Sequence, residues 1–131
     1  MFRRIFRLVI GGLAGLVLLV PTTTASAATT WDFVGLWTSV DAVDGSDQIM
    51  FINPGRRIML FDTSATACDD DAPAIVTGRG TISGDDLDAT LEMRCIGGGG
   101  LSGVDATFSY DSGDDTLTDD MGGAATVWSR A

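Results

Sequence analysis

The residues of this chain that could take part in chemistry are its carboxylates and two cysteines. The sequence holds 18 Asp and Glu residues, eight arginines, no Lys and no His. Without His or Lys, the usual general base, imidazole metal ligand and Schiff-base amine are missing. Carboxylate pairs could serve a glycosidase, but the acids fall in turn-like segments, and Trp31, Trp37 and Trp128 near the chain ends do not predict a sugar-binding cleft. We therefore expect a non-enzymatic protein with no catalytic residues and no cofactor.

Two acidic clusters could bind a hard cation, because oxygen ligands suit calcium. One is Asp69-Asp70-Asp71 and the other combines Asp41, Asp44 and Asp47. Neither matches the spacing of an EF-hand, and consecutive acids in a loop are more often solvated. The sequence therefore favours solvated loops over a metal site.

The N-terminus has the pattern of an export signal. Arg3, Arg4 and Arg7 precede an apolar run over residues 8–20, and Ala25-Ser26-Ala27 offers the small residues that a signal peptidase needs. The alternative, a retained membrane anchor, needs about 20 apolar residues to cross a membrane, whereas the run over residues 8–20 has 13. We predict a signal peptide over residues 1–27, exported by the Sec route rather than the twin-arginine route. Residues 28–131 would then form one domain, secreted or held in the cell envelope.

Export would make the chain more acidic and would oxidise its thiols. Removal of three arginines takes the formal charge from −10 to −13, which disfavours nucleic acid and anionic membrane as partners. High charge can serve solubility alone, or it can attract a cationic partner. Cys68 and Cys95 are expected to pair, because an oxidising compartment favours disulfides. No CxxC motif suggests a redox role.

The rest of the chain must position these groups, and its pattern predicts all-β structure. Short runs of Val, Ile, Thr, Phe and Trp alternate with Gly, Asp, Pro and Ser clusters. The clearest hairpin covers residues 74–95 and turns at Gly84-Asp85, with one apolar face and one polar face. The pairs expected on its inner face are Ile82 with Leu87, Gly80 with Ala89, Gly78 with Leu91 and Val76 with Met93.

A second hairpin joins residues 48–52 to residues 57–62 through Asn53-Pro54-Gly55-Arg56. A two-residue or four-residue connection here pairs Phe51 with Ile58 and Ile49 with Leu60, and places these four side chains in the core. The opposite face would then carry an apolar stripe of Met50, Ile52, Met59 and Phe61. Either the N-terminal segment covers this stripe, or it is exposed for interaction.

Three further strands, over residues 36–41, 104–110 and 115–119, and a last one over residues 125–130, complete a set of eight. Short connections suggest an antiparallel up-and-down meander that closes into a small barrel. Tight turns would gather at one end and longer loops at the other. Cys68 and Cys95 both fall at the long-loop end, which would form a mouth.

The segment Phe33-Val34-Gly35-Leu36-Trp37 resembles the F-x-G-x-W opening of calycins, the superfamily of lipocalins and fatty-acid-binding proteins. The resemblance implies that Trp37 lies at the closed end, with Arg130 from the last strand against its ring. It also implies binding of a small apolar or amphiphilic molecule. The chain is similar, too, to small exported barrels with one disulfide that inhibit metalloproteases.

Two functions follow as hypotheses. The first is a lipocalin-like barrel that binds a small apolar molecule, with Gly78, Gly80, Leu91 and Phe108 around a gap in the core. Alternatively, Leu91 and Phe108 fill that gap. The second is a protein-interaction module or protease-inhibitor-like barrel, which would contact a cationic or apolar protein surface through the stripe or the acidic mouth loops.

Overall fold

The computed structural model describes residues 26–99 and 101–131, so the predicted signal peptide lies outside the described residues except for Ser26 and Ala27. The described residues form eight antiparallel strands, one short α-helix and one 3-10 turn. In chain order the elements are α1 (Thr30–Phe33), β1 (Gly35–Val40), β2 (Asp47–Ile52), β3 (Arg57–Asp62), η1 (Asp69–Asp71), β4 (Ala74–Ser83), β5 (Asp86–Cys95), β6 (Leu101–Asp111), β7 (Thr116–Asp119) and β8 (Thr126–Arg130).

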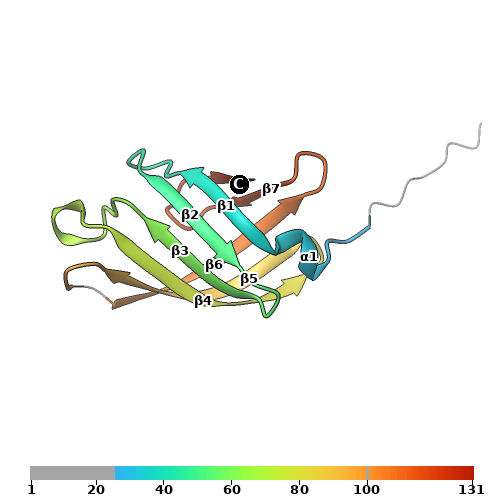
Figure 1. Cartoon of the computed structure of the whole chain (residues 1–131), viewed down its shortest axis with the longest axis horizontal. Coiled ribbons are helices and arrows are strands. Elements are labelled where there is room, and N and C mark those ends of the chain that lie inside the picture. Colours follow the sequence, from blue (N-terminus) through green and yellow to red (C-terminus); the bar gives the residue numbers. More distant parts are fainter. Residues whose placement is uncertain (1–25, 100) are drawn as a thin grey trace, which may run out of the picture.

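The strands follow one another around a closed barrel, from β1 to β8 in sequence order. The last strand returns to the first through the pairs Trp37 with Arg130 and Thr38 with Ser129. This confirms the predicted eight-stranded up-and-down meander. Figure 1 shows helix α1 beside the β2–β3 turn at one end of the barrel, and the long β3–β4 and β5–β6 connections at the other.

The β4–β5 hairpin has the predicted register over its whole length. Ser83 pairs with Asp86 across the two-residue turn, and all four expected inner pairs are present. Gly84 has a φ of 63°, which suits the first central position of a type II′ turn and is easily adopted only by glycine. Local turn chemistry was therefore sufficient to define this hairpin.

The β2–β3 hairpin has a different register from the predicted one. Ile52 pairs with Ile58 and Phe51 pairs with Met59. The Asn53 N–H donates to the Arg57 carbonyl oxygen at 3.0 Å and leaves a three-residue loop over residues 54–56, in which Arg56 adopts a left-handed φ of 60°. A shift of one position reverses the faces of one strand. Met50 and Ile52 are fully buried, whereas Ile49 and Phe51 are exposed.

The predicted interaction stripe is therefore wrong for its two β2 residues and right for its two β3 residues. Met50 and Ile52 belong to the core, and only Met59 and Phe61 lie on the outer surface. The predicted core positions Ile58 and Leu60 are confirmed, while Ile49 and Phe51 are not core residues.

The space expected beside Gly78 and Gly80 is occupied. A Cβ on Gly78 would lie 2.6 Å from Leu91 Cδ2 and would also meet the carbonyl oxygen of Thr90, and a Cβ on Gly80 would lie 2.8 Å from Leu87 Cγ. Both glycines thus allow close approach of neighbouring strands. Leu91 and Phe108 are fully buried in the same core, so these four residues form packed interior and not a ligand gap.

The disulfide between Cys68 and Cys95 is present, with Cα atoms 5.6 Å apart. It attaches the β3–β4 connection to the end of β5, where Cys68, Ala65 and Ala74 form a small second core. The two cysteines are 27 positions apart. A loop of this length corresponds to about 3 to 4 kcal/mol of stabilisation on the chain-entropy model.

Candidate functional site

The barrel has a cavity of about 260 Å³ at its long-loop end. It opens where the barrel wall is incomplete, because β6 pairs with β7 only from Ser109 to Asp111. Nearer the mouth, Ser102 and Val104 of β6 face the cavity across from the β7–β8 connection. The short β7 strand therefore creates the opening. The residues around the cavity are Asp41, Val43, Gln48, Leu60, Asp62, Ala65, Thr66, Ala67, Val76, Met93, Ser102, Val104, Asp119, Met121, Gly122 and Thr126.

The inner wall of this cavity is apolar. Leu60 and Val76 are buried neighbours on β3 and β4, and Val76 pairs with Met93 on β5. Met93 and Met121 are only partly buried and pack against the core from the mouth side. Flexible methionine side chains adapt to ligands of different shape. The wall can therefore receive the apolar part of a small molecule.

The rim of the cavity is polar and is built around Gln48. Its Nε2 donates hydrogen bonds to Asp41 Oδ2 at 2.9 Å and to Asp62 Oδ2 at 3.1 Å. Asp62 Oδ1 also accepts a hydrogen bond from the Ser46 hydroxyl at 2.7 Å. Because both amide hydrogens of Gln48 are used, the two carboxylates are held at fixed positions beside the cavity.

A third carboxylate, Asp119, is only 4% exposed. Its Oδ2 accepts a hydrogen bond from the indole Nε1 of Trp128 at 2.5 Å, and its Oδ1 accepts one from the Met121 backbone N–H at 2.8 Å. Burial raises the pKa of Asp119, against the opposing effect of these hydrogen bonds, and the nearby negative charges of Asp120 and Asp41 raise it further. A cation placed here would relieve that cost.

The cavity thus has three aspartates and no arginine among the residues around it. Every buried side-chain nitrogen or oxygen within the described residues has a hydrogen-bond partner. The carboxylates still retain acceptor capacity, since each ionised group offers about four lone-pair positions. The arrangement can hold a small molecule with an apolar body and a positively charged end.

The opposite end of the barrel is closed by the predicted contact between Trp37 and Arg130. The guanidinium carbon lies 4.2 Å from the centroid of the fully buried indole ring. Arg130 also donates hydrogen bonds of 2.8 Å to the carbonyl oxygens of Val34 and Asp32, and it forms an ion pair with Asp115 at 2.8 Å. This bonding lowers the pKa of Asp115 and raises that of Arg130.

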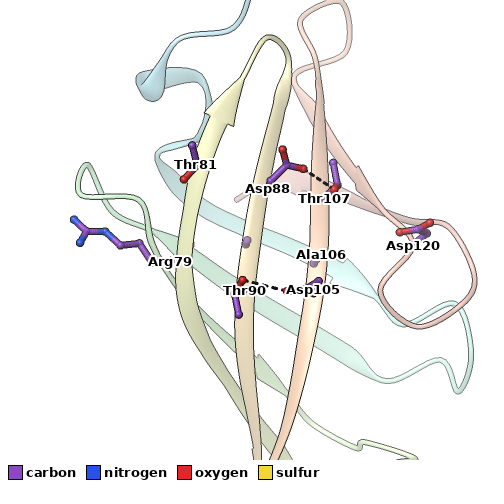
Figure 2. A pocket seen from close by; sticks show the side chains of 9 residues that line it. Arg79, Thr81, Asp88, Thr90, Asp105, Ala106, Thr107 and Asp120 are labelled. Atoms are coloured by element: carbon purple, nitrogen blue, oxygen red, sulfur yellow. Dashed lines mark hydrogen bonds between the residues drawn. The ribbon is translucent and has the colours of Figure 1, made fainter.

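The outer surface of β5 and β6 is polar. Figure 2 shows hydrogen bonds that link hydroxyls to carboxylates across β5 and β6, from Thr90 to Asp105 at 3.1 Å and from Thr107 to Asp88 at 2.7 Å. Ser109 and Asp86 add a third at 2.6 Å. The hydroxyls and carboxylates of these three pairs bond to each other and do not converge on a common point. We call the surface that these six residues form the wet face.

The sequence analysis named Asp41 in an acidic cluster and placed Val76 and Met93 on an inner face, but it missed Gln48, Asp62 and Asp119 as cavity residues. Gln48 and Asp62 are paired on β2 and β3 and point inward at the mouth, whereas the predicted register puts Gln48 on the same outer face as Met50 and Ile52. Asp119 was expected only as a strand end. Gln48, Met50 and Ile52 alternate along one strand, and so do Ile58, Leu60 and Asp62, but the opposite face of the hairpin is equally apolar, so alternation alone did not identify the inward set.

The acidic clusters considered for calcium do not converge. Among residues 26–99 and 101–131, no three or more His, Cys, Asp or Glu side chains are arranged to hold a metal ion. Within the same residues no helix has the length and apolar character needed to span a membrane.

Comparisons with family models, curated proteins and solved structures found no match. The eight-stranded antiparallel barrel itself is consistent with a calycin-like fold.

Proposed function

We propose that this protein is a non-enzymatic, calycin-like binding protein that takes a small amphiphilic molecule into the mouth of its barrel, apolar part first and cationic group last. The observation that carries the proposal is the cavity of about 260 Å³, with apolar inner walls and an acidic rim. An apolar cavity of about 150 Å³ is sufficient for benzene. The ligand would therefore be larger than benzene and smaller than a typical drug molecule.

The charge pattern supports a cationic end on this ligand. Asp41, Asp62 and Asp119 surround the cavity without a basic residue among its lining. An ammonium group near Asp119 would offset the cost of its buried negative charge, and the hydrogen bonds around Gln48 keep the other two carboxylates in place. An anionic amphiphile would meet the same carboxylates as repulsive charges.

A matched series of hexylamine, hexanol and hexanoate tests the proposal by calorimetry and by tryptophan fluorescence. Trp128 reports on the cavity because its indole donates to Asp119. We expect hexylamine to bind most tightly and hexanoate least. Asp119→Asn should weaken hexylamine severalfold and leave hexanol unchanged, because it removes a charge but little volume.

A second pair of variants tests whether the ligand occupies the cavity. Val104→Phe places a ring in the space and should weaken hexylamine at least tenfold. Val127→Phe makes the same change on the outer surface, where Val127 is 55% exposed, and should have no effect. Equal loss in both variants, or none in either, would contradict binding inside the barrel.

A further inference from the structure

We propose that the outer face of strands β1 to β4 docks a segment of a partner protein whose apolar side chains are flanked by carboxylates. This second surface is separate from the mouth cavity. It is defined by six apolar side chains that are 37% to 54% exposed, namely Leu36, Ile49, Phe51, Met59, Phe61 and Ile75. We call them the apolar patch.

The register makes the apolar patch continuous. Phe51 of β2 lies between Leu36 of β1 and Met59 of β3. In the next row towards the mouth, Phe61 of β3 lies between Ile49 and Ile75. All six residues line one surface groove. Contiguous exposed apolar side chains of this kind mark interaction sites, because water contacts them at a free-energy cost that a partner would remove.

Arginines border this patch. Arg57 and Arg79 stand directly opposite each other on β3 and β4, and Arg94 stands opposite Ile75. A second groove joins Arg57 and Arg79 to Phe51 and Met59, with Glu92 on its far side. Together with Arg56 in the adjoining turn, these are four of the five arginines in the part of the chain that the structure describes.

Within the described residues, neither arginine of this pair forms an ion pair, although Glu92 lies along the same groove. Like charges directly opposite each other destabilise an antiparallel pair of strands. Within residues 26–99 and 101–131 the ion pair is that of Arg130 with Asp115, so no carboxylate lies within 4 Å of Arg57 or Arg79. A partner carboxylate between the two guanidinium groups would supply the missing charge, with two-pronged hydrogen bonds.

Charge also distinguishes among the possible occupants. The described residues combine all 18 acids with five arginines, so an anionic lipid surface would repel the molecule as a whole. A second copy related by a two-fold axis would bring the same arginine-bordered patch against itself. A short acidic, apolar segment of another protein carries few charges and lies only against the arginine-bordered patch, so it meets much less of this repulsion than an extended anionic surface does.

The test uses a library of peptides whose centre samples Leu, Ile, Phe, Val and Met and whose flanks are Glu, Gln or Lys. We expect the protein to bind Glu-flanked peptides at least tenfold more tightly than Lys-flanked ones with the same centre. Arg57→Glu combined with Arg79→Glu should reverse that preference. Met59→Thr combined with Phe61→Asn should abolish binding of both sets.

Two controls keep the outcome specific. Thr107→Glu combined with Ser109→Glu adds negative charge on the exposed outer face of β6 and should change nothing, and Val104→Phe should block the cavity without affecting peptides. Circular dichroism verifies that each variant is folded. Equal binding of Glu-flanked and Lys-flanked peptides would overturn the proposal. So would patch-dependent dimers in sizing experiments, or binding to vesicles of anionic lipid in place of peptides.

Discussion

Both ends of the barrel bury a tryptophan, but the charges beside the two rings are arranged differently. Each holds a fully buried tryptophan whose indole N–H is hydrogen-bonded, Trp37 to the Phe33 carbonyl oxygen at 2.9 Å and Trp128 to the Asp119 carboxylate. At the closed end Arg130 neutralises Asp115 and covers the ring of Trp37. At the mouth the charged residues that line the cavity are all carboxylates, and no arginine lies among the described residues around it. We therefore expect the closed end to contribute mainly to stability, and we place the proposed binding site at the mouth.

The largest effect is expected from Trp37→Ala at the closed end. Removal of this fully buried ring should cost about 3 to 5 kcal/mol of unfolding free energy, because it leaves a cavity beneath Arg130. Leu36→Ala is the matched control on the adjacent, 46% exposed position, and it should cost less than about 1 kcal/mol. Urea denaturation measures both. Similar losses would show that Trp37 does not anchor the closed end.

Loss of the disulfide should lower the stability of the whole domain and, in addition, loosen the mouth more than the closed end. Cys68→Ser combined with Cys95→Ser should lower stability by about 3 to 4 kcal/mol on the chain-entropy model. Hydrogen exchange should become faster in the β3–β4 connection, which the disulfide attaches to β5. The amides of β1 near Trp37 should keep their order of protection. Faster exchange confined to the closed end would contradict the division between the two ends.

Arg130→Met should have an intermediate effect of about 1 to 2 kcal/mol, since it removes the cation–π contact and the hydrogen bonds to the Val34 and Asp32 carbonyls. Arg130→Lys should recover only part of this loss, because one ammonium cannot replace the planar guanidinium. Arg94→Met, at an exposed position, is the control and should be nearly neutral. If Arg130→Lys recovered all of the lost stability, the positive charge of Arg130 alone would account for its role, and the planar shape of the guanidinium would not matter.

The smallest effects should appear as opposite responses to pH. The pKa of Asp115 is lowered by Arg130. Asp115 therefore stabilises the folded state above the pKa that it has in the unfolded chain, and this stabilisation is lost as pH falls through its pKa in the folded protein. The pKa of Asp119 is raised by burial. Its contribution to folding stability is therefore complete below the pKa that it has in the unfolded chain, and is lost as pH rises through its pKa in the folded protein.

Neutral variants separate the two carboxylates. Asp115→Asn should be less stable than wild type at neutral pH, and the difference should vanish in acid. Asp119→Asn places an amide NH₂ against one of the two N–H groups that donate to Asp119, so it should be less stable than wild type in acid. This deficit should shrink as pH rises, because only the wild type then has a buried negative charge. Thermal unfolding from pH 3 to pH 7 measures both, and responses of the same sign would contradict the electrostatic contrast between the ends.

The sequence by itself determined the parts of this protein that depend on local chemistry or on strong alternation. Gly84-Asp85 and the alternating residues around it specify the β4–β5 register, and all its predicted pairs are present. The segment from Phe33 to Trp37 and the final Arg130 predicted the closed end. The number and order of strands and the disulfide were predicted as well.

Tertiary structure alone decided the β2–β3 register and the mouth. Both faces of that hairpin are apolar, so the pattern did not say which face is buried. Arg56 adopts a left-handed conformation that is intrinsically unfavourable for a residue with a Cβ. It is held there because its carbonyl accepts a hydrogen bond from the Gly80 N–H at 2.9 Å, and because the resulting register buries Met50 and Ile52. The same register turns Gln48 inward to meet Asp41 and Asp62, and this contact between distant segments creates the acidic rim.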